Sequence, residues 1–200
     1  MPTHKDTITA VILAGGQGSR LSGLDKGLIL LQEKNLVQHI IERIRPQVAE
    51  IIISANRNID AYSKLGFSVY KDDIDGYAGP LAGILKALQH CQSEWLLVIP
   101  ADSPFIPHDL AHRLGENIHT NKIAIPYDGK NLQPTFALIH KSLAKSLESF
   151  LHQGERKARV WMEQQAHTKI DFSDQPNSFI NINTEDDLQN AEQHFEKYMR

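Results

Sequence analysis

The chain has 200 residues, about the size of one domain, and its hydrophobic fraction of 41% is that of an ordinary globular protein. A net charge of −3 excludes a general electrostatic attraction to nucleic acid or to an anionic membrane, so any anion site has to be local. The single cysteine, Cys91, excludes an intrachain disulfide, and no apolar run reaches the roughly 18 residues that span a membrane. Because the start also lacks a signal-peptide pattern, we expect a cytoplasmic protein with one domain over residues 1–200, of which 1–6 are disordered.

Hydrophobic patterning predicts strands and helices that alternate along the first half of the chain. The apolar, β-branched run Ile8–Leu13 is typical of a strand buried on both faces. A glycine-rich loop follows, and then an amphipathic helix over residues 35–44 that ends at Pro46. The next expected elements are a strand over 50–55, a short helix over 59–66, a strand over 67–72, a helix over 79–91 and a strand over 94–102.

The second half of the chain continues this alternation. The expected elements are a helix over 107–118, strands over 122–127 and 133–139, helices over 140–152 and 156–165, a strand over 168–172, an edge-like strand over 179–183 and a helix from about Thr184. This order predicts an α/β fold with a doubly wound, mostly parallel sheet and helices on both faces. Ligands of such sheets bind beyond the carboxyl ends of the strands, where this chain places residues 15–26, Asp72 and residues 101–104.

The loop after the first strand has the composition of an anion site. Gly15, Gly16 and Gly18 allow tight turns and positive φ, and successive N–H groups of such a turn can surround an anion. Arg20 and Lys26 add cationic donors that suit phosphate oxygens. The loop matches neither the dinucleotide-binding fingerprint nor a Walker A loop. The alternative is a glycine-rich surface turn with solvated charges.

Two aspartates follow later strands of the expected sheet. Asp102 lies between Pro100 and Pro104, just past a buried strand, so we expect its carboxylate to point into the crevice. A carboxylate that faces a polyphosphate loop can bind Mg²⁺, which takes one or two carboxylates together with phosphate oxygens and water. Asp72 is a second acidic candidate. The alternatives are a helix cap for Asp102 and a solvated surface carboxylate for Asp72.

Seven short motifs occur in an order that resembles one enzyme family. They are LAGGQGSR, DKG, GPLAG, PADSPFIP, DGKNLQPTFAL, GERKAR and NINTEDDL. With these motifs the chain resembles the molybdenum cofactor guanylyltransferases from about Ile8 to Leu188. The resemblance implies a Rossmann-like nucleotidyltransferase fold, transfer of GMP from GTP to the terminal phosphate of molybdopterin, and Mg²⁺ as cofactor.

The resemblance implies nucleotide-binding roles for residues after the first strand. Leu13, Ala14, Gly15 and Gly16 resemble the segment that reads guanine and supports the phosphates, and Lys26 resembles the family's phosphate-binding lysine. The related cytidylyltransferases resemble LAAG at this place. Because Gly15 lacks the corresponding methyl group, it favours the larger purine base.

Later motifs supply further implied site residues. By the same resemblance Asp72 contacts the nucleotide and Asp102 binds Mg²⁺. Asn181 and Asn183 match the asparagines of an N-x-N-T segment near the active site. These two residues can also lie in a turn before a helix capped by Thr184, and the two interpretations are compatible.

Three positions depart from the family pattern. Ser54, counted here among the nucleotide-binding residues, stands where a close relative carries an asparagine. Asn56 lies two positions further on, so the guanosine contact from this loop is open. Ser22 replaces a glycine of the phosphate loop, and no proline follows Thr184.

The implied reaction is an in-line attack of a molybdopterin phosphate oxygen on the α-phosphorus of GTP, with pyrophosphate as the leaving group. Positioning and charge neutralisation carry such a transfer. We expect Asp102 to hold Mg²⁺ between the α-phosphate and the attacking phosphate, while Arg20, Lys26 and loop amides stabilise the leaving pyrophosphate. The attacking phosphate is already ionised, so no general base is expected.

The pterin side of the site has its own candidates. Gln133 and Pro134 belong to one motif, and Arg156 belongs to the next. Lys157 and Arg159 complete a basic cluster with Arg156 that could receive the pterin phosphate. The alternative is a solvated helix face on which these cations oppose glutamates.

Rival functions remain within and outside this enzyme class. A molybdopterin cytidylyltransferase and a sugar-phosphate nucleotidyltransferase share the architecture, and Gly15 with the full set of motifs argues against both. A non-catalytic GTP-binding carrier of the cofactor is disfavoured by Lys26 and Asp102. The expected partners are GTP and molybdopterin, with apo-molybdoenzymes or their chaperones as candidate acceptors. Nothing in the sequence indicates binding to nucleic acid or to a membrane.

Overall fold

A computed structural model describes residues 4–15, 25–72, 79–118 and 120–199 of the chain. Its centre is a seven-stranded sheet with strand order β5-β4-β1-β6-β8-β7-β9. The strands are β1 (Ile8–Leu13), β4 (Glu50–Ser54), β5 (Ser68–Tyr70), β6 (Trp95–Pro100), β7 (Ile123–Tyr127), β8 (Leu138–His140) and β9 (His167–Asp171). Strand β8 runs antiparallel to both of its neighbours, and the other adjacent strands pair in parallel. The predicted mostly parallel sheet is confirmed.

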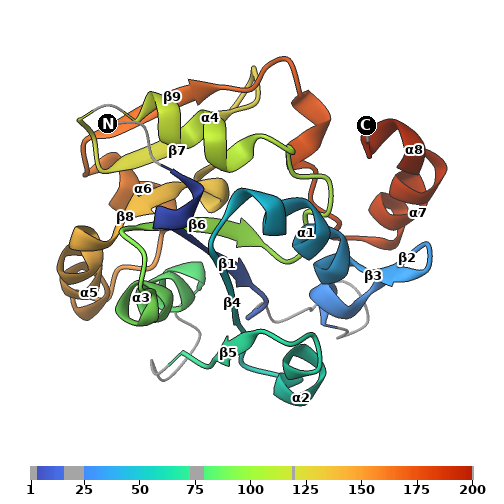
Figure 1. Cartoon of the computed structure of the whole chain (residues 1–200), viewed down its shortest axis with the longest axis horizontal. Coiled ribbons are helices and arrows are strands. Elements are labelled where there is room, and N and C mark those ends of the chain that lie inside the picture. Colours follow the sequence, from blue (N-terminus) through green and yellow to red (C-terminus); the bar gives the residue numbers. More distant parts are fainter. Residues whose placement is uncertain (1–3, 16–24, 73–78, 119, 200) are drawn as a thin grey trace.

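Helices cover both faces of the sheet, as predicted (Figure 1). One face carries α1 (Leu36–Ile44) and α4 (Leu110–Asn117). The other carries α3 (Pro80–His90), α5 (Ala144–His152) and α6 (Ala158–Glu163). Outside these layers lie α2 (Ile59–Ser63), next to β5, and the C-terminal α7 (Glu185–Gln193) and α8 (Phe195–Tyr198). The last two lie beside a hairpin of β2 (Leu30–Leu31) and β3 (Lys34–Asn35).

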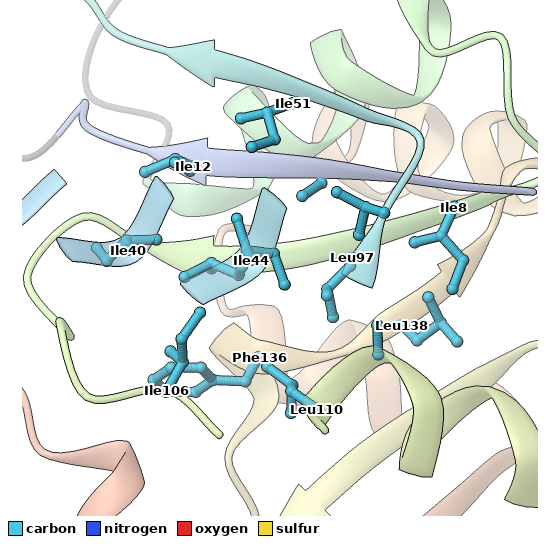
Figure 2. Packing of buried hydrophobic residues seen from close by; sticks show 14 of the residues in the cluster. Ile8, Ile12, Ile40, Ile44, Ile51, Leu97, Ile106, Leu110, Phe136 and Leu138 are labelled. Carbon is cyan, nitrogen blue, oxygen red and sulfur yellow. The ribbon is translucent and has the colours of Figure 1, made fainter. Parts of the chain in front are cut away.

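The packing around β1 explains why its sequence is apolar throughout. Ile8, Ala10 and Ile12 belong to the core cluster on the α1 and α4 face, whereas Val11 belongs to the cluster on the α3 face. All four side chains are at most 1% exposed. Figure 2 shows the first cluster, to which β1, α1, β6 and β8 contribute side chains. A strand in this central place needs apolar residues on both faces, which removes the alternating pattern of a half-exposed strand.

The register of the parallel strands brings their carboxyl ends to one level. Leu13 of β1 pairs with Ser54 of β4 and with Pro100 of β6, and Ser54 pairs in turn with Tyr70 of β5. The backbone continues these pairings by one residue, since the N–H of Ala14 donates to the Ser54 carbonyl at 2.7 Å. The segments that follow these four strands therefore meet at a single edge of the sheet.

Two predicted strands differ from the structure. Residues 133–139 form a 3-10 turn at Pro134–Phe136 before the short β8, because a proline has no N–H to give to a sheet ladder. Residues 179–183 form no strand: a 3-10 turn at Pro176–Phe179 leads into an extended segment. Its Ile182 N–H donates to the Asp102 carbonyl at 2.8 Å instead of to a neighbouring strand. The β2–β3 hairpin was not predicted, since strands of two residues leave no readable pattern.

The described chain begins with a 3-10 turn and ends with two short helices. Within residues 1–6, where we expected disorder, Lys5–Thr7 form a 3-10 turn capped by His4, and residues 1–3 lie outside the described residues. At the other end α7 begins after Thr184, as predicted. Among the described residues no helix combines the length and the apolar character that crossing a bilayer would require.

Candidate active site

A pocket of about 220 Å³ opens where the parallel strands end. Its walls come from the ends of β1, β4 and β6, the second residue after β5, the start of α3, the turn at residues 25–27 and the segment before β8. The predicted nucleotide-binding residues that line it are Leu13, Ala14, Gly15, Lys26, Ser54, Asp72 and Asp102. Gly16 and Arg20, which were predicted with them, lie outside the described residues.

A lysine, a carboxylate and an asparagine meet at one side of this pocket. The Lys26 ammonium Nζ lies 3.0 Å from Asp102 Oδ2 and also donates to Asn183 Oδ1. These partners are 76 and 157 residues away from Lys26 in the sequence. The Lys26 and Asp102 side chains are 25% and 16% exposed, so the pair is accessible from the pocket. An ammonium suits phosphate oxygens and a carboxylate suits a divalent cation, which makes this cluster competent to hold a metal-bound polyphosphate.

The segment between β9 and α7 crosses the site and supplies its asparagines. Its Ile182 N–H bonds the Asp102 carbonyl, as described above, and the Ser103 hydroxyl donates to Asn181 Oδ1. Ser103 is fully buried, whereas Asn181 is exposed. Both predicted asparagines thus lie at Asp102 or directly beside it, although no strand holds them there.

The start of α7 fixes the end of this segment. The Asp187 carboxylate accepts hydrogen bonds from the N–H groups of Asn183 and Thr184, each at 2.9 Å, while the Thr184 hydroxyl accepts from the Asp187 N–H at 3.1 Å. Partial burial would raise the pKa of the Asp187 carboxyl, but these hydrogen bonds, with help from the charge of Lys26, bring that pKa below its usual range. The asparagine segment is therefore both a helix cap and a neighbour of Lys26, as the two interpretations allowed.

The opposite side of the pocket is built on an amide and a second carboxylate. Asn56 Nδ2 donates to Asp72 Oδ2 at 2.6 Å, and Asn56 Oδ1 accepts from the Asp72 N–H at 3.1 Å. A β-carbon placed on Gly15 would lie 3.4 Å from Asn56 Nδ2, so Gly15 directly faces this amide. An added methyl group would fill space beside the amide, in line with the larger base expected from Gly15.

Ser54 has a packing role at the floor of the pocket. It is 5% exposed, and its hydroxyl would lie 2.5 Å from a β-carbon placed on Gly83 of α3. Gly83 thus lets α3 lie directly on the end of β4. In this loop the amide beside Gly15 is that of Asn56, two positions beyond Ser54.

The first pair of pterin-side candidates does not line the pocket. The Gln133 side chain donates to Asp128 Oδ2 at 2.7 Å, and Pro134 begins the 3-10 turn before β8. Their neighbour Thr135 does line the pocket. It was missed because the candidates were taken from the motif by resemblance, which assigned no role to Thr135.

The basic cluster does not line the pocket either. Arg156 donates to the backbone carbonyls of Leu151 and Glu155, each at 2.8 Å, and does not line the pocket. Arg159 pairs with Glu163 at 2.7 Å along α6. For Arg159 this geometry is that of the alternative, a solvated helix face with paired charges.

Further lining residues come from motifs in which they were given no role. Gly79, Pro80 and Gly83 of GPLAG form the α3 wall, and Asp25 and Gly27 of DKG flank Lys26. The signal for these residues was present in the motifs themselves. A single sequence does not show which of these side chains face the pocket.

The donor set suits a divalent cation only when a ligand completes it. Among the described residues no group of three or more His, Cys, Asp and Glu side chains could hold a metal ion. Asp102 offers one carboxylate beside the pocket, with Asn183 Oδ1 close to the same ammonium. Mg²⁺ is commonly bound by one or two carboxylates together with substrate phosphates and water, so these residues fit a metal that arrives with a polyphosphate.

Relatives with known names match this chain over nearly its full length. Residues 10–169 match the family model described as a MobA-like NTP transferase domain. The molybdenum cofactor guanylyltransferase of Shewanella piezotolerans is 46% identical over 185 residues, which cover 92% of this chain and 91% of that protein. The protein of the same name from Photobacterium profundum is 44% identical over 190 residues, or 94% of this chain and 97% of that protein.

Solved structures share the arrangement of strands and helices. Molybdopterin-guanine dinucleotide biosynthesis protein A from Archaeoglobus fulgidus has a TM-score of 0.78 and 29% identity, over 94% of this chain and 99% of that chain. The 4-diphosphocytidyl-2C-methyl-D-erythritol synthase from Anaerococcus prevotii has a TM-score of 0.76 at 16% identity, over 96% and 97% of the two chains. At that identity the second likeness concerns the fold alone.

Proposed function

Because this chain belongs to the molybdenum cofactor guanylyltransferase family, we propose that it transfers GMP from GTP to the terminal phosphate of molybdopterin and releases pyrophosphate. Family membership makes the chain a nucleotidyltransferase. The observation that carries the assignment to this pocket is the cluster of Lys26, Asp102 and Asn183 at the strand ends. It is a charge-bearing group of the kind that a transferred phosphoryl group requires.

Lys26 has the main electrostatic role in this proposal. Its ammonium binds the β- and γ-phosphates of GTP and stabilises the negative charge that moves onto pyrophosphate. Asp102 holds Mg²⁺, which when bound supplies further neutralisation of phosphate charge. The Asp102 carbonyl is tied to the Ile182 N–H, so the carboxylate stands on a backbone that two segments fix. The site needs no general base, because the attacking phosphate is already ionised.

The guanine base occupies the side of the pocket formed by Leu13, Ala14 and Gly15. Asn56 and Asp72 face that side as a hydrogen-bonded pair, and Gly15 leaves space beside the Asn56 amide. The loop residues Gly16 and Arg20 complete the phosphate site by their resemblance to the family. Asn181 and Asn183 lie on the Asp102 side, where the molybdopterin phosphate attacks.

Molybdopterin enters from the Asp102 side, with Gln133, Pro134 and Arg156 as candidates for its outer contacts. We place the whole chain in the cytoplasm as a single nucleotidyltransferase domain. Apo-molybdoenzymes or their chaperones are the acceptors that could receive its product.

Pyrophosphate release tests this function directly. The protein is incubated with molybdopterin, molybdate and Mg²⁺ and with GTP, CTP or ATP in parallel. Of the three nucleotides, we expect only GTP to give pyrophosphate release, and we expect this release to be lost when the metal is removed with a chelator. Release with CTP would contradict the assignment of the base pocket. Tight GTP binding without release under any condition would favour a cofactor carrier instead.

A further inference from the structure

The carboxylate of Asp25 is buried at the base of the Lys26 turn. Asp25 is 8% exposed, and its Oδ1 accepts a hydrogen bond from the Tyr62 hydroxyl at 2.5 Å. Its Oδ2 accepts from Asn58 Nδ2 at 3.2 Å. A carboxylate taken out of water costs free energy unless donors of this kind replace the water. Asp25 therefore holds its turn against α2 through two side-chain donors.

Tyr62 is built to donate this hydrogen bond. It is fully buried on α2, and its ring belongs to the core cluster under α1 and α4. Burial first, and then the hydrogen bond to Asp25, raises the pKa of the Tyr62 hydroxyl above its usual value. The hydroxyl thus keeps its proton, and the packed ring gives the donor one position.

Gly27 shows that the approach of Tyr62 is close. A β-carbon on Gly27 would lie 2.5 Å from the Tyr62 hydroxyl oxygen and 3.2 Å from Cβ of Ala101 at the end of β6. Only a glycine at this place lets the hydroxyl pass between the turn and β6 to reach Asp25. The hydrogen bond to Asp25 and the glycine at position 27 are two separate observations of the close approach of Tyr62 to this turn.

The turn that begins at Asp25 determines the backbone position from which the Lys26 side chain extends. Leu28 N–H donates to the Asp25 carbonyl at 3.0 Å, which closes the 3-10 turn at Lys26–Leu28. From this backbone the Lys26 side chain extends to Asp102, and its Nζ lies 3.0 Å from Asp102 Oδ2. A lysine side chain has four rotatable bonds and loses much conformational entropy when its end is held, so its reach depends on a fixed starting point.

We propose that Asp25 and Tyr62 are a positioning pair, whose hydrogen bond sets the Lys26 ammonium at the phosphate side of the pocket. The proposal rests on the function proposed above, in which Lys26 binds the phosphates of GTP. Asp25 lines the pocket, but both of its carboxylate oxygens accept hydrogen bonds from Tyr62 and Asn58, so we assign the pair a role through Lys26. The sequence Asp-Lys-Gly then has three parts: an acid that fixes the turn, a cation that reaches the phosphates, and a glycine that admits the tyrosine.

A double-mutant cycle on GTP affinity tests this pair. Tyr62→Phe keeps the buried ring and removes the donor. We expect it to raise the Kd for GTP, measured by calorimetry in the presence of Mg²⁺, by about tenfold, the usual effect of losing a hydrogen bond to a charged group. In a Lys26→Met background the same substitution should change the Kd by less than about twofold, because the effect passes through Lys26. Tyr127→Phe is the matched control, since it also removes a hydroxyl donor, to the Gly129 carbonyl at 2.9 Å, away from the pocket.

The outcomes separate positioning from a purely structural role. A structural role would lower the unfolding temperature of Tyr62→Phe and leave the Kd of the folded protein unchanged, which would overturn the proposal. An equal rise in Kd with and without Lys26 would overturn it too. If Tyr62→Phe does not fold, Asp25→Asn is put through the same cycle with the same expected results. The assay measures binding, so a wild-type protein that binds GTP but releases no pyrophosphate would contradict the proposed function and still decide on this pair.

Discussion

The predicted site residues fall into two groups that lie in different places in the structure. Of those taken from the ends of β1, β4, β5 and β6, the ones that the structure describes gather around one pocket. Those taken from the segments before β8 and α6 do not: Gln133 bonds Asp128, and Arg156 bonds backbone carbonyls. Both groups were predicted from resemblance to the same family. The difference is that strand direction predicts where the first group meets, whereas no such rule covered the second.

The antiparallel strand β8 accounts for much of this difference. Its last residue, His140, pairs with Trp95 at the beginning of β6. The carboxyl end of β8 therefore lies at the far edge of the sheet, and residues before β8 approach the pocket. Thr135, three positions before β8 begins, is the residue that does so. The rule for parallel sheets, applied to this strand, would place the site residues at its carboxyl end, away from the pocket.

The largest effect is expected at the charged cluster of the first group. Asp102→Ala should lower kcat/KM for GMP transfer by roughly 10²- to 10³-fold, because the carboxylate that is to hold the metal is lost. Pyrophosphate release measures this loss. Thermal unfolding of the variant should stay close to that of the wild type, and Asp186→Ala, at an exposed carboxylate of α7, serves as control. Normal turnover in Asp102→Ala would break the assignment of the pocket.

Lys26→Met should have opposite effects on two ligands. The Kd for GTP should rise by about 10- to 100-fold, because a charge-assisted contact to phosphate is lost. The affinity of the nucleotide-free protein for Mn²⁺, measured by electron paramagnetic resonance, should instead increase, because Asp102 loses the ammonium that lies 3.0 Å from it. A simultaneous loss of both affinities would show that Lys26 holds the site together structurally.

Asp187 predicts a dependence of stability on pH next to the asparagine segment. The pKa of Asp187 is lower in the folded than in the unfolded chain. The ionised carboxylate therefore stabilises the fold at pH values above 3.8, the ordinary pKa of an aspartate. That contribution is lost as the pH falls through the folded-state pKa. Asp187→Asn should lower the free energy of unfolding by about 1 kcal/mol near neutral pH, a usual value for a helix cap. Denaturant unfolding at decreasing pH should show the two proteins converging; a constant difference would argue against this role.

The smallest effect is expected in the second group. Arg156→Ala should change the Kd for GTP by less than about twofold, because its guanidinium bonds backbone carbonyls outside the pocket. The same variant assayed for molybdopterin gives the sharper comparison. A raised KM for molybdopterin with unchanged GTP binding would place the pterin phosphate at this cluster. A large change in GTP affinity would contradict the division of the site drawn here.

Local hydrophobic patterning predicted the elements whose burial requires a regular apolar pattern. β1 was expected at Ile8–Leu13 and is observed there, since burial on both faces demands a continuous apolar run. The helix at Pro80–His90 was also expected, because a proline near its start and an apolar face are local signals. Residues 179–183 show the limit: their alternation resembles a strand, but their backbone bonds a loop carbonyl instead.

Chain order and hydrophobic runs were therefore enough for the α/β class, the parallel strands and the edge at which a ligand would bind. The contacts of Lys26 with Asp102 and Asn183, the hydroxyl of Tyr62 on Asp25, and the amide of Asn56 on Asp72 depended on packing. Each joins segments far apart in the chain, and the place where such segments meet is set by strand order, strand direction and helix packing. Those are properties of the whole folded chain, and no short stretch of residues contains them.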